Sequence, residues 1–416
     1  MTTRGTGSVD LELGSDIDSV LDALRDFVRT EVLPIEEKLG DLLTDPSRTY
    51  DSTGRYRPEI LEARRAIRMR SAEAGYLQMF VPESIGGGGL GALAHYAVWE
   101  DLYHRWSMKH WLAFESVSHW ATGPSHLFEH SSPRVREEIF APLMSGEKTM
   151  CFAMSEPDAG SDLWQMRTTA HCEDDHWIIN GIKQWMTNGP YADYAIVFAV
   201  TDHEQLARRR GGISAFVVDT TSPGYRVDSV IKMFGHVGSN EAILSFTDVE
   251  VPDDALLGEL HEGLAFGLSG TTVGRLYNAG RSVGLSRWAL EQALDYTAAR
   301  QAFGSPVLDY QGVSFPLATC AIELHAAHLM GVNAARTIDA GRSGAMEAAM
   351  AKAYSTEVAG RVIDQAVQAL GGMGLTNEVY LTQAWLELRA VRIADGSAEM
   401  LRRLIVGRLR KGDRDL

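Results

Sequence analysis

Two stretches in the middle of the chain combine backbone donors, a hydroxyl and an aromatic ring near the ends of predicted strands. Residues 151–162 begin as an apolar strand and continue into a Ser-Glu-Pro turn and a Gly-Ser loop. Such a loop exposes N–H groups and a hydroxyl, which suit a flat polar ring or a phosphate. In residues 181–189, Trp185 and Thr187 are two positions apart, so a strand places them on one face.

Three further stretches carry charged or amide side chains beside helix ends or glycines. Residues 300–306 read Arg-Gln-Ala-Phe-Gly-Ser-Pro, with Gln311 following, and an arginine at a helix end suits a pyrophosphate. Residues 368–374 read Gln-Ala-Leu-Gly-Gly-Met-Gly, and residues 393–399 read Ile-Ala-Asp-Gly-Ser-Ala-Glu. The last stretch offers one carboxylate, Asp395, whose alternative interpretation is a plain Asp-Gly turn before the final helix.

Two other patterns favour a structural interpretation. Gly86, Gly88 and Gly91 have the spacing of a dinucleotide-binding fingerprint, but no strand–helix–strand unit surrounds them. We therefore predict a glycine-rich loop between helices. His325 and His328 lie three apart on a predicted helix without an evident third ligand, so we predict no metal site.

The segments around these stretches change from helical to β and back to helical. Between residues 17 and 32, apolar side chains recur at spacings of three and four, which indicates one buried helix face. Residues 149–252 contain short β-rich runs, and Asn180-Gly181 predicts a two-residue hairpin between two of them. Residues 278–300 and 343–370 each predict one long helix, and Gly371-Gly372 ends the second.

Composition and charge exclude several classes of protein. The chain has 416 residues, enough for two or three domains, and a formal net charge of −16, which disfavours nucleic acid as a partner. The first 18 residues lack the basic start and apolar run of a signal peptide, and no apolar run is long enough to predict a membrane span. Three cysteines without paired spacing favour a reduced, cytoplasmic location.

The five stretches, in this order on a helical–β–helical chain, resemble the acyl-CoA dehydrogenase superfamily over nearly the whole length. The resemblance implies an α+β multidomain fold, with an N-terminal helical domain (1–148), a middle β-barrel domain (149–255) and a C-terminal four-helix bundle (256–416). It also implies FAD in an extended form between the β and helical domains. Part of that FAD would contact a neighbouring subunit of a homotetramer, a dimer of dimers.

The same resemblance implies a role for each matching residue. Those expected around the flavin ring are Phe152, Met154, Ser155, Trp185 and Thr187, with Ser155 at the pyrimidine edge and Thr187 near the N5 edge. Those expected to bind FAD from the adjacent subunit are Arg300, Phe303, Gln311, Gln368, Gly371 and Gly372. Ser397 and Glu399 would meet the adenosine end, and Ser161 would lie between FAD and the phosphates of CoA. Arg275 and Gly396 are expected at the acyl-CoA site.

Asp395 departs from the family pattern, which usually has a glutamate as the base in this stretch. Some branches carry a glutamate on an earlier helix instead, but the corresponding position here is Gly274. Asp395 is therefore the candidate base for removing the α-proton of a thioester. A branch of acyl-CoA dehydrogenases reads Ala-Asp-Gly here, and nitroalkane oxidases of the superfamily also use an aspartate. Ala394 could give the shorter side chain room, or admit a larger substrate.

These expectations lead to one function and two alternatives. The first is an FAD-dependent acyl-CoA dehydrogenase that converts an acyl-CoA or carrier-bound thioester to the 2,3-enoyl thioester and passes electrons to an electron-transfer flavoprotein. The second is a flavin oxidase or monooxygenase acting on a small non-CoA substrate. The third is a protein that keeps the fold without flavin, against which the intact flavin-site residues argue. Bulky residues from Trp106 to Trp120 predict a pocket for a short, branched or ring-bearing acyl group, or else ordinary helix packing.

Overall fold

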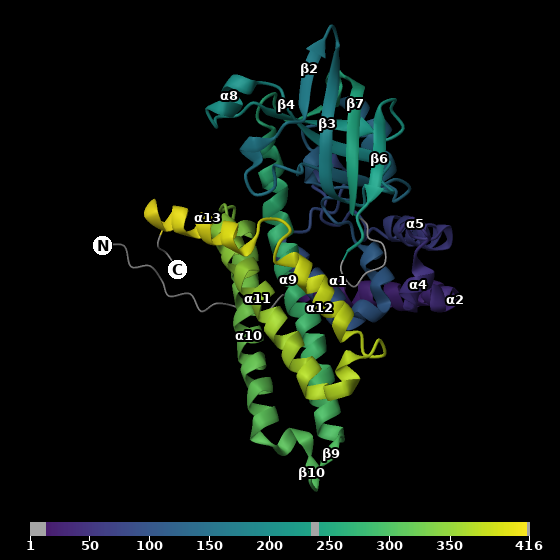
Figure 1. Ribbon diagram of the computed structural model, residues 1–416, viewed down its shortest axis with the longest axis vertical. Helices are drawn as coiled ribbons and strands as arrows, with labels where there is room; N and C mark the ends of the chain where they lie inside the picture. The colour runs from purple at the N-terminus through teal and green to yellow at the C-terminus, as the bar shows by residue number, and fades with distance from the viewer. Residues whose placement is uncertain (1–13, 234–240, 414–416) are drawn as a thin grey trace.

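The computed structural model describes residues 14–233 and 241–413, in which a helical first part leads into a sheet and then into a long helical bundle (Figure 1). The α-helices of the first part are α1 Ser15–Phe27, α2 Leu33–Leu39, α3 Asp41–Thr44, α4 Pro46–Thr49, α5 Pro58–Glu73, α6 Ala92–Trp106 and α7 Ala141–Met144. Leu21, Leu24 and Phe27 of α1 are buried, as their spacing predicts. The predicted glycine-rich loop lies between a 3-10 turn, Glu83–Ile85, and α6.

The middle part is one eight-stranded sheet. Its strands are β1 Met150–Ala153, β2 Thr169–Glu173, β3 His176–Thr187, β4 Tyr194–Val200, β5 Ile213–Asp219, β6 Tyr225–Val230, β7 Glu241–Pro252 and β8 Leu256–Leu257, with the short helix α8 His203–Ala207 between β4 and β5. The strand order is β6-β7-β3-β2-β4-β5-β8, and β1 adds to β4 in parallel. All seven residues of β4 are buried, and its apolar side chains form part of the core around the sheet.

The hairpin predicted at Asn180-Gly181 is wrong. Both residues lie inside β3, at a register shift opposite β7, and the turn between β2 and β3 falls at Asp174, which has a φ of 53°. The Asn180 side chain exchanges two hydrogen bonds with Asp248 on β7, of 3.0 and 2.9 Å. A Cβ at Gly181 would lie 2.6 Å from Thr168 Cα, so close approach of two backbones, and not a turn, requires the glycine.

The last part consists of long helices: α9 Gly263–Ala299, α10 Gln311–Asp339, α11 Ala345–Leu370, α12 Leu381–Val391 and α13 Ala398–Arg410, with a hairpin of β9 Gln301–Ala302 and β10 Ser305–Pro306 after α9. Helix α11 ends where predicted, at Gly371, which has a φ of 60°. Helix α9 begins 15 residues before the predicted start at 278. It runs from the sheet at the top of Figure 1 to the β9–β10 hairpin at the bottom.

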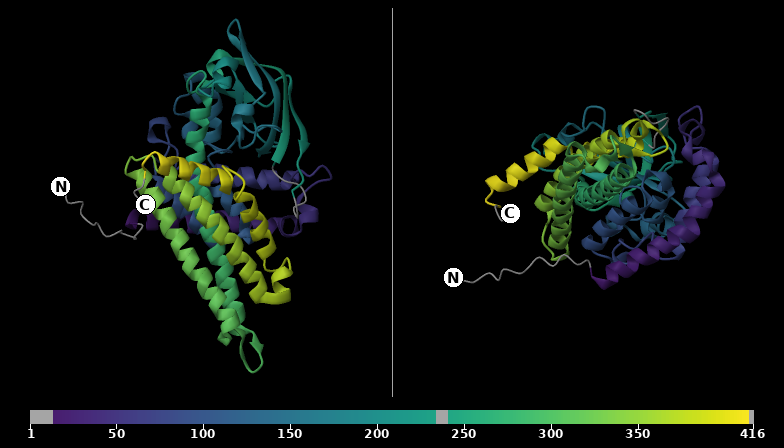
Figure 2. Two further views of the ribbon diagram at one scale, coloured as in Figure 1. Left: turned by 60° about the vertical axis from the view of Figure 1, so that its left-hand side comes forward. Right: turned by 90° about the horizontal axis from the view of Figure 1, so that it is seen from below.

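Two large cores hold these parts together. One fills the sheet and receives Leu264, Phe266 and Val273 from the start of α9. The other joins apolar side chains of α1, α5 and α6 to those of α9–α12, so the first and last helical parts of the chain share a core. The two turned views show the same close association of early and late helices (Figure 2). The fold class expected from the sequence, helices on either side of a β segment in the chain, is confirmed.

Among the described helices, α10 alone passes a length and composition test for crossing a membrane, with a mean hydropathy of 1.2 in its most apolar window. About a third of that window, 33%, is buried within the chain, and the helix packs on α9 and α11. Core helices of soluble proteins pass the same test, so this is weak evidence for a membrane span. The expectation of no membrane partner stays a prediction.

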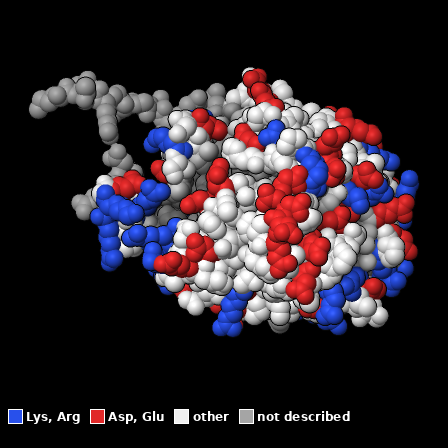
Figure 3. Space-filling view, turned by 90° about the horizontal axis from the view of Figure 1, so that it is seen from above, with Lys and Arg blue, Asp and Glu red and all other residues white. Residues whose placement is uncertain are grey.

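Charged side chains of both signs cover the face that is seen from above in Figure 3. Acidic side chains extend over the middle of this face, and basic side chains lie at its left-hand edge and again along its right-hand and lower edges. The acidic groups are consistent with the formal net charge of −16.

Candidate active site

Asp395 lies in the turn between α12 and α13, with its carboxylate against helix α9. Its backbone has a φ of 52°, which is unusual for a residue other than glycine. Its Oδ2 accepts a hydrogen bond of 2.7 Å from Asn278 Nδ2 on α9. A Cβ added at Gly274 would lie 2.9 Å from the same oxygen. The sequence showed only that Gly274 cannot act as an alternative base. The structure adds that the missing side chain leaves the space that the Asp395 carboxylate occupies.

Two polar groups of Asp395 have no hydrogen-bond partner among residues 14–233 and 241–413. These groups are the carboxylate oxygen Oδ1 and the backbone N–H. The side chain is only half-buried, so a bound molecule could reach them. One residue thus offers a proton acceptor and a backbone donor side by side.

A buried lysine fixes the backbone of this turn. Lys352 on α11 is fully buried, and its Nζ donates to the carbonyl oxygens of Ala394 and of Gly396, the latter at 2.7 Å. These carbonyls flank Asp395 on both sides. Burial lowers the pKa of Lys352 to about 8, although the Asp395 carboxylate opposes the shift. The lysine was not identified from the sequence, where it is one polar residue in an alanine-rich helix.

Further polar side chains extend from Asp395 into the helical core. Asn278 Oδ1 accepts from Arg281 Nε at 3.0 Å, and Arg281 Nη1 donates to Glu387 at 2.8 Å and to Tyr277 Oη at 3.0 Å. Arg275 is buried, and its Nε has no partner in the described part of the chain. Burial lowers the pKa of Arg275, against the opposing effect of the Asp395 carboxylate.

Aromatic rings connect this region to the first strand of the sheet. The Trp120 indole nitrogen would lie 2.8 Å from a Cβ at Gly274, and the Trp120 ring is 4.9 Å from the Phe152 ring, centroid to centroid. Trp120 therefore connects Phe152 of β1 to the part of α9 that Asp395 contacts. Trp120 Nε1 is buried without a partner among the described residues.

A buried ion pair holds the turn that follows β1. Lys183 is fully buried, and its Nζ donates to Glu156 at 2.8 Å and to the Met154 carbonyl at 3.0 Å. Glu156 also accepts from the backbone N–H groups of Arg167 and Thr168. Burial would raise the pKa of Glu156, but the pairing with Lys183 outweighs it, so the pKa is lowered. These contacts fix the Ser155 turn, and sequence reasoning missed both members of the pair.

Strand β3 brings Trp185 next to that turn. The Gln184 N–H donates to the Ser155 carbonyl at 3.0 Å, and Trp185 follows at a register shift with a φ of 69°. Its ring is 52% exposed, which is unusual for a tryptophan on a sheet. Thr187 is also exposed, and Met186 between them is buried; because Trp185 lies at the register shift, its shared face with Thr187 stays a prediction. Ser161 is exposed in the loop after the turn.

The other predicted cofactor residues lie elsewhere on the chain. Arg300, Phe303 and Gln311 surround the β9–β10 hairpin, at the opposite end of the molecule from the sheet (Figure 1). The Phe303 ring is 99% exposed. Gln368, Gly371 and Gly372 are exposed at the end of α11. Ser397 caps α13 by accepting from Met400 N–H at 3.4 Å, and Glu399 is exposed.

The bulky segment from Trp106 to Trp120 divides into two groups. Trp111 stacks on Tyr56, Phe114 stacks on Tyr103, and Trp106 packs on His110, all of which are ordinary helix contacts. His119 instead packs on Tyr277, and Trp120 lies over Gly274, so only this end of the segment approaches Asp395. The described residues contain no group of three possible metal ligands, and His328 Nδ1 lies 2.8 Å from Glu100; the absence of a metal site at His325 and His328 stays a prediction.

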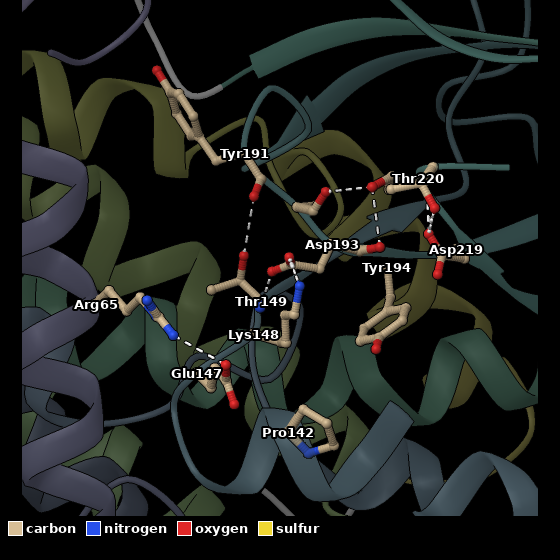
Figure 4. A network of polar contacts seen from close by, with 12 residues as sticks. Arg65, Pro142, Glu147, Lys148, Thr149, Tyr191, Asp193, Tyr194, Asp219 and Thr220 are labelled. Atoms are coloured by element: carbon tan, nitrogen blue, oxygen red, sulfur yellow. Dashed lines mark hydrogen bonds and ion pairs between the residues drawn. The ribbon is translucent and has the colours of Figure 1, made fainter. Parts of the chain in front are cut away.

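A separate cleft of about 460 Å³ lies between α5 and the residues around β1 and β4. Its charged groups are paired, with Arg65 bonded to Glu147 at 3.0 Å and Lys148 to Asp193 at 2.7 Å (Figure 4). None of the residues predicted for the site lines this cleft.

Comparison with known proteins identifies the family. Models of the acyl-CoA dehydrogenase N-terminal, middle and C-terminal domains match residues 15–147, 151–249 and 261–409. The chain belongs to the acyl-CoA dehydrogenase family. A short-chain specific acyl-CoA dehydrogenase from Homo sapiens is 33% identical over 399 residues, covering 96% of this chain and 91% of its own length. Subunit CarC of a caffeyl-CoA reductase-Etf complex from Acetobacterium woodii is 32% identical, covering 89% of this chain and 94% of its own length.

Solved structures agree with the family assignment. Butyryl-CoA dehydrogenase from Megasphaera elsdenii has a TM-score of 0.80 and 26% identity, covering 97% of this chain and 100% of its own. The FAD complex of PigA has a TM-score of 0.82 and 25% identity, covering 98% of this chain and 100% of its own. The family consists of FAD-dependent oxidoreductases, so the expected enzyme class and the expected cofactor are confirmed.

The residues present in this acyl-CoA dehydrogenase fit FAD. The Trp185 ring is exposed beside the fixed Ser155 turn, and Trp120 Nε1 is a buried donor without a partner in the described residues. Exposed hydroxyls of Thr187 and Ser161 stand on the same part of the sheet domain. The individual roles of the predicted site residues, from Phe152 to Glu399, stay predictions.

Proposed function

We propose that this protein dehydrogenates an acyl-CoA thioester, or a carrier-bound one, to the 2,3-enoyl thioester, with Asp395 as the base. The observation that supports this most is the pair of free groups on Asp395, the Oδ1 atom and the backbone N–H. Removal of a thioester α-proton needs a base in contact and a donor to the carbonyl oxygen. One turn supplies both.

Each neighbour of Asp395 has a distinct task in this proposal. The Asp395 Oδ1 atom takes the α-proton, while its backbone N–H donates to the thioester carbonyl. Lys352 holds the two carbonyls on either side, so the turn keeps its shape when substrate binds. Trp120 and Phe152 exclude water on the side of the sheet. FAD, when bound, accepts the hydride from the β-carbon.

The other predicted site residues are proposed to hold the cofactor and substrate. Phe152, Met154, Ser155, Trp185 and Thr187 would surround the flavin ring. Arg300, Phe303, Gln311, Gln368, Gly371 and Gly372 would hold the FAD of a neighbouring subunit; the first three lie around the β9–β10 hairpin, at the opposite end of the molecule from the sheet (Figure 1). Ser161, Arg275 and Gly396 would contact acyl-CoA, and Ser397 and Glu399 the adenosine end. A homotetramer in the cytoplasm and an electron-transfer flavoprotein as acceptor complete the proposal.

A panel of acyl thioesters, scored by bleaching of the flavin absorbance without oxygen, tests this function. We expect the fastest bleaching with short acyl-CoA esters, since relatives are named for short-chain and butyryl substrates. No bleaching by any acyl thioester in the panel would refute the proposal.

A second candidate is a flavin oxidase or monooxygenase that acts on a small non-CoA substrate. The presence of aspartate where the family usually has glutamate favours it. Oxygen consumption, measured beside turnover with an electron-transfer mediator, separates the two. Turnover that needs the mediator supports the dehydrogenase, and turnover driven by oxygen with a non-CoA substrate supports the oxidase.

A further inference from the structure

Asn278 connects the Asp395 carboxylate to the charged groups of the helical core. It is fully buried on α9, one turn after Gly274. Because the position is inside the helix, its side-chain amide is not needed to cap a helix end. Its two polar atoms have one partner each, Asp395 Oδ2 at 2.7 Å and Arg281 Nε at 3.0 Å.

The partners of Asn278 determine which way its amide points. An arginine side chain only donates hydrogen bonds, so the atom of Asn278 that faces Arg281 must be the carbonyl oxygen. The NH₂ group then faces Asp395 and donates to its carboxylate. Arg281 is itself held, because Glu387 accepts from Nη1 at 2.8 Å and Tyr277 Oη lies 3.0 Å from the same nitrogen. The direction of the amide is therefore set by groups that do not touch Asp395.

We propose that Asn278, oriented by Arg281, is a positioning residue that ties down Oδ2 of Asp395 and leaves Oδ1 free to take the substrate proton. This inference rests on the proposed function, in which Asp395 is the base. A short aspartate side chain must be placed within a fraction of an ångström, since a misplacement of about 1 Å can cost roughly 100-fold in rate. The same amide donates a hydrogen bond to the carboxylate, and replacing Asn278 removes it.

The groups that face Asp395 allow this effect to be measured in a defined pH range. The charge of Asp395 acts on Arg275 and Tyr277 of α9, on Lys352 of α11 and on His119 of the segment before β1. Arg281 lies behind Asn278, where it is paired with Glu387 of α12. Burial lowers the pKa of His119 to about 4 and that of Lys352 to about 8. Because Asn278 is uncharged, replacing it leaves every one of these charges in place.

The test is the pH dependence of flavin bleaching by butyryl-CoA, followed by rapid mixing between pH 5 and pH 7.5. Asn278→Leu keeps the size of the side chain and removes the donor, and Asn278→Ala covers the case in which leucine fits poorly. We expect the maximal bleaching rate to fall at least about tenfold. On the acid limb, where the rate falls as pH is lowered, we expect the pH of half-maximal rate to rise by about one unit. Thr297→Val, a buried change on the same helix, should alter neither.

A third variant removes the orienting group instead of the amide. Arg281→Met combined with Glu387→Gln takes away both charges of this partly buried ion pair together, so no unpaired charge is left. The acid limb should move in the same direction by a smaller amount, because Asn278 remains but is free to turn. A merely structural role of Asn278 would change stability and leave the acid limb where it is in all three variants, and that result would overturn the proposal.

Asp395→Asn separates this inference from the proposed function. If Asp395→Asn bleaches at the wild-type rate, Asp395 is not the base and the proposed function fails at that residue. If Asp395→Asn is slow but the Asn278 variants match the wild type in rate and pH profile, the base assignment stands and the positioning role alone is refuted.

Discussion

The Asp395 turn is held from two directions by single residues, Asn278 at the carboxylate and Lys352 at the backbone. Sequence reasoning identified Asp395 because it falls in a recognisable stretch. It could not identify Lys352 or Asn278, because a lysine in an alanine-rich helix and an asparagine in a glycine-rich one look like surface residues until the fold brings them together. Both contacts join residues more than 40 positions apart in the chain.

Lys352 should make stability depend on pH in the alkaline range. Its pKa is lowered by burial to about 8 in the folded protein, from an ordinary 10.5. Between these two pKa values the unfolded chain binds more protons than the folded one. The contribution of Lys352 to the free energy of unfolding therefore increases as pH rises. Below about pH 8 both states are protonated and the slope vanishes.

Lys352→Met should remove that gain. Urea unfolding at pH values from 7 to 10 should show a slope lower by up to about 1.4 kcal/mol per pH unit near pH 9, compared with the wild type. Lys411→Met, at an exposed lysine, is the control and should keep the wild-type slope. Equal slopes in the Lys352 variant and the wild type would show that this lysine is not buried as a cation.

At the scale of elements, helix α9 is the part that sequence analysis described least well. Its first half carries glycines at positions 263, 267, 270 and 274, all buried. A sequence this rich in glycine disfavours a helix, yet the helix begins at Gly263, 15 residues before the start predicted at 278. In the structure these glycines let Met154, Trp120 and Asp395 approach the helix backbone. Tertiary contact overrides helix propensity here, as it overrides the turn preference of Asn180-Gly181 within β3.

Gly274→Ala tests this use of α9. The added Cβ would lie 2.9 Å from Asp395 Oδ2 and 2.8 Å from Trp120 Nε1, closer than carbon contacts allow, so the carboxylate must shift. We expect flavin bleaching to slow at least about tenfold while FAD stays bound. Gly360→Ala on α11, where a Cβ meets nothing within 4 Å, is the matched control and should bleach at the wild-type rate. A wild-type rate in Gly274→Ala would contradict the assigned position of the carboxylate.

At the scale of the whole molecule, the residues predicted to bind FAD lie toward two opposite ends of the chain (Figure 1). The sheet carries Ser155 and Trp185 at one end, and the β9–β10 hairpin carries Arg300 and Phe303 at the other (Figure 1). The sequence predicted the helical–β–helical order from the change of periodicity alone. The domain boundaries at 148/149 and 255/256 stay predictions. The homotetramer also stays a prediction, because the structure describes a single copy of the chain.

Arg300→Ala should weaken FAD binding without weakening the fold. Arg300 is exposed at the end of α9, and a charged contact to a pyrophosphate is worth about 1.5–3 kcal/mol. The FAD content after gel filtration should fall, while the unfolding temperature of the FAD-free protein should stay the same. Arg208→Ala, at an exposed arginine beside α8, should retain FAD. Unchanged FAD content in Arg300→Ala, or a monomer that holds stoichiometric FAD, would contradict the role given to a neighbouring subunit.

The central claim is that Asp395 removes the α-proton, and Asp395→Asn tests it most directly. Asparagine has nearly the same shape and cannot accept that proton, and the predicted FAD contacts do not depend on the exchanged atom. Rapid mixing of the FAD-loaded variant with butyryl-CoA should show bleaching at least about 100-fold slower than in the wild type. Asp364→Asn, at an exposed aspartate on α11, should bleach normally. Bleaching of Asp395→Asn at the wild-type rate would contradict the claim.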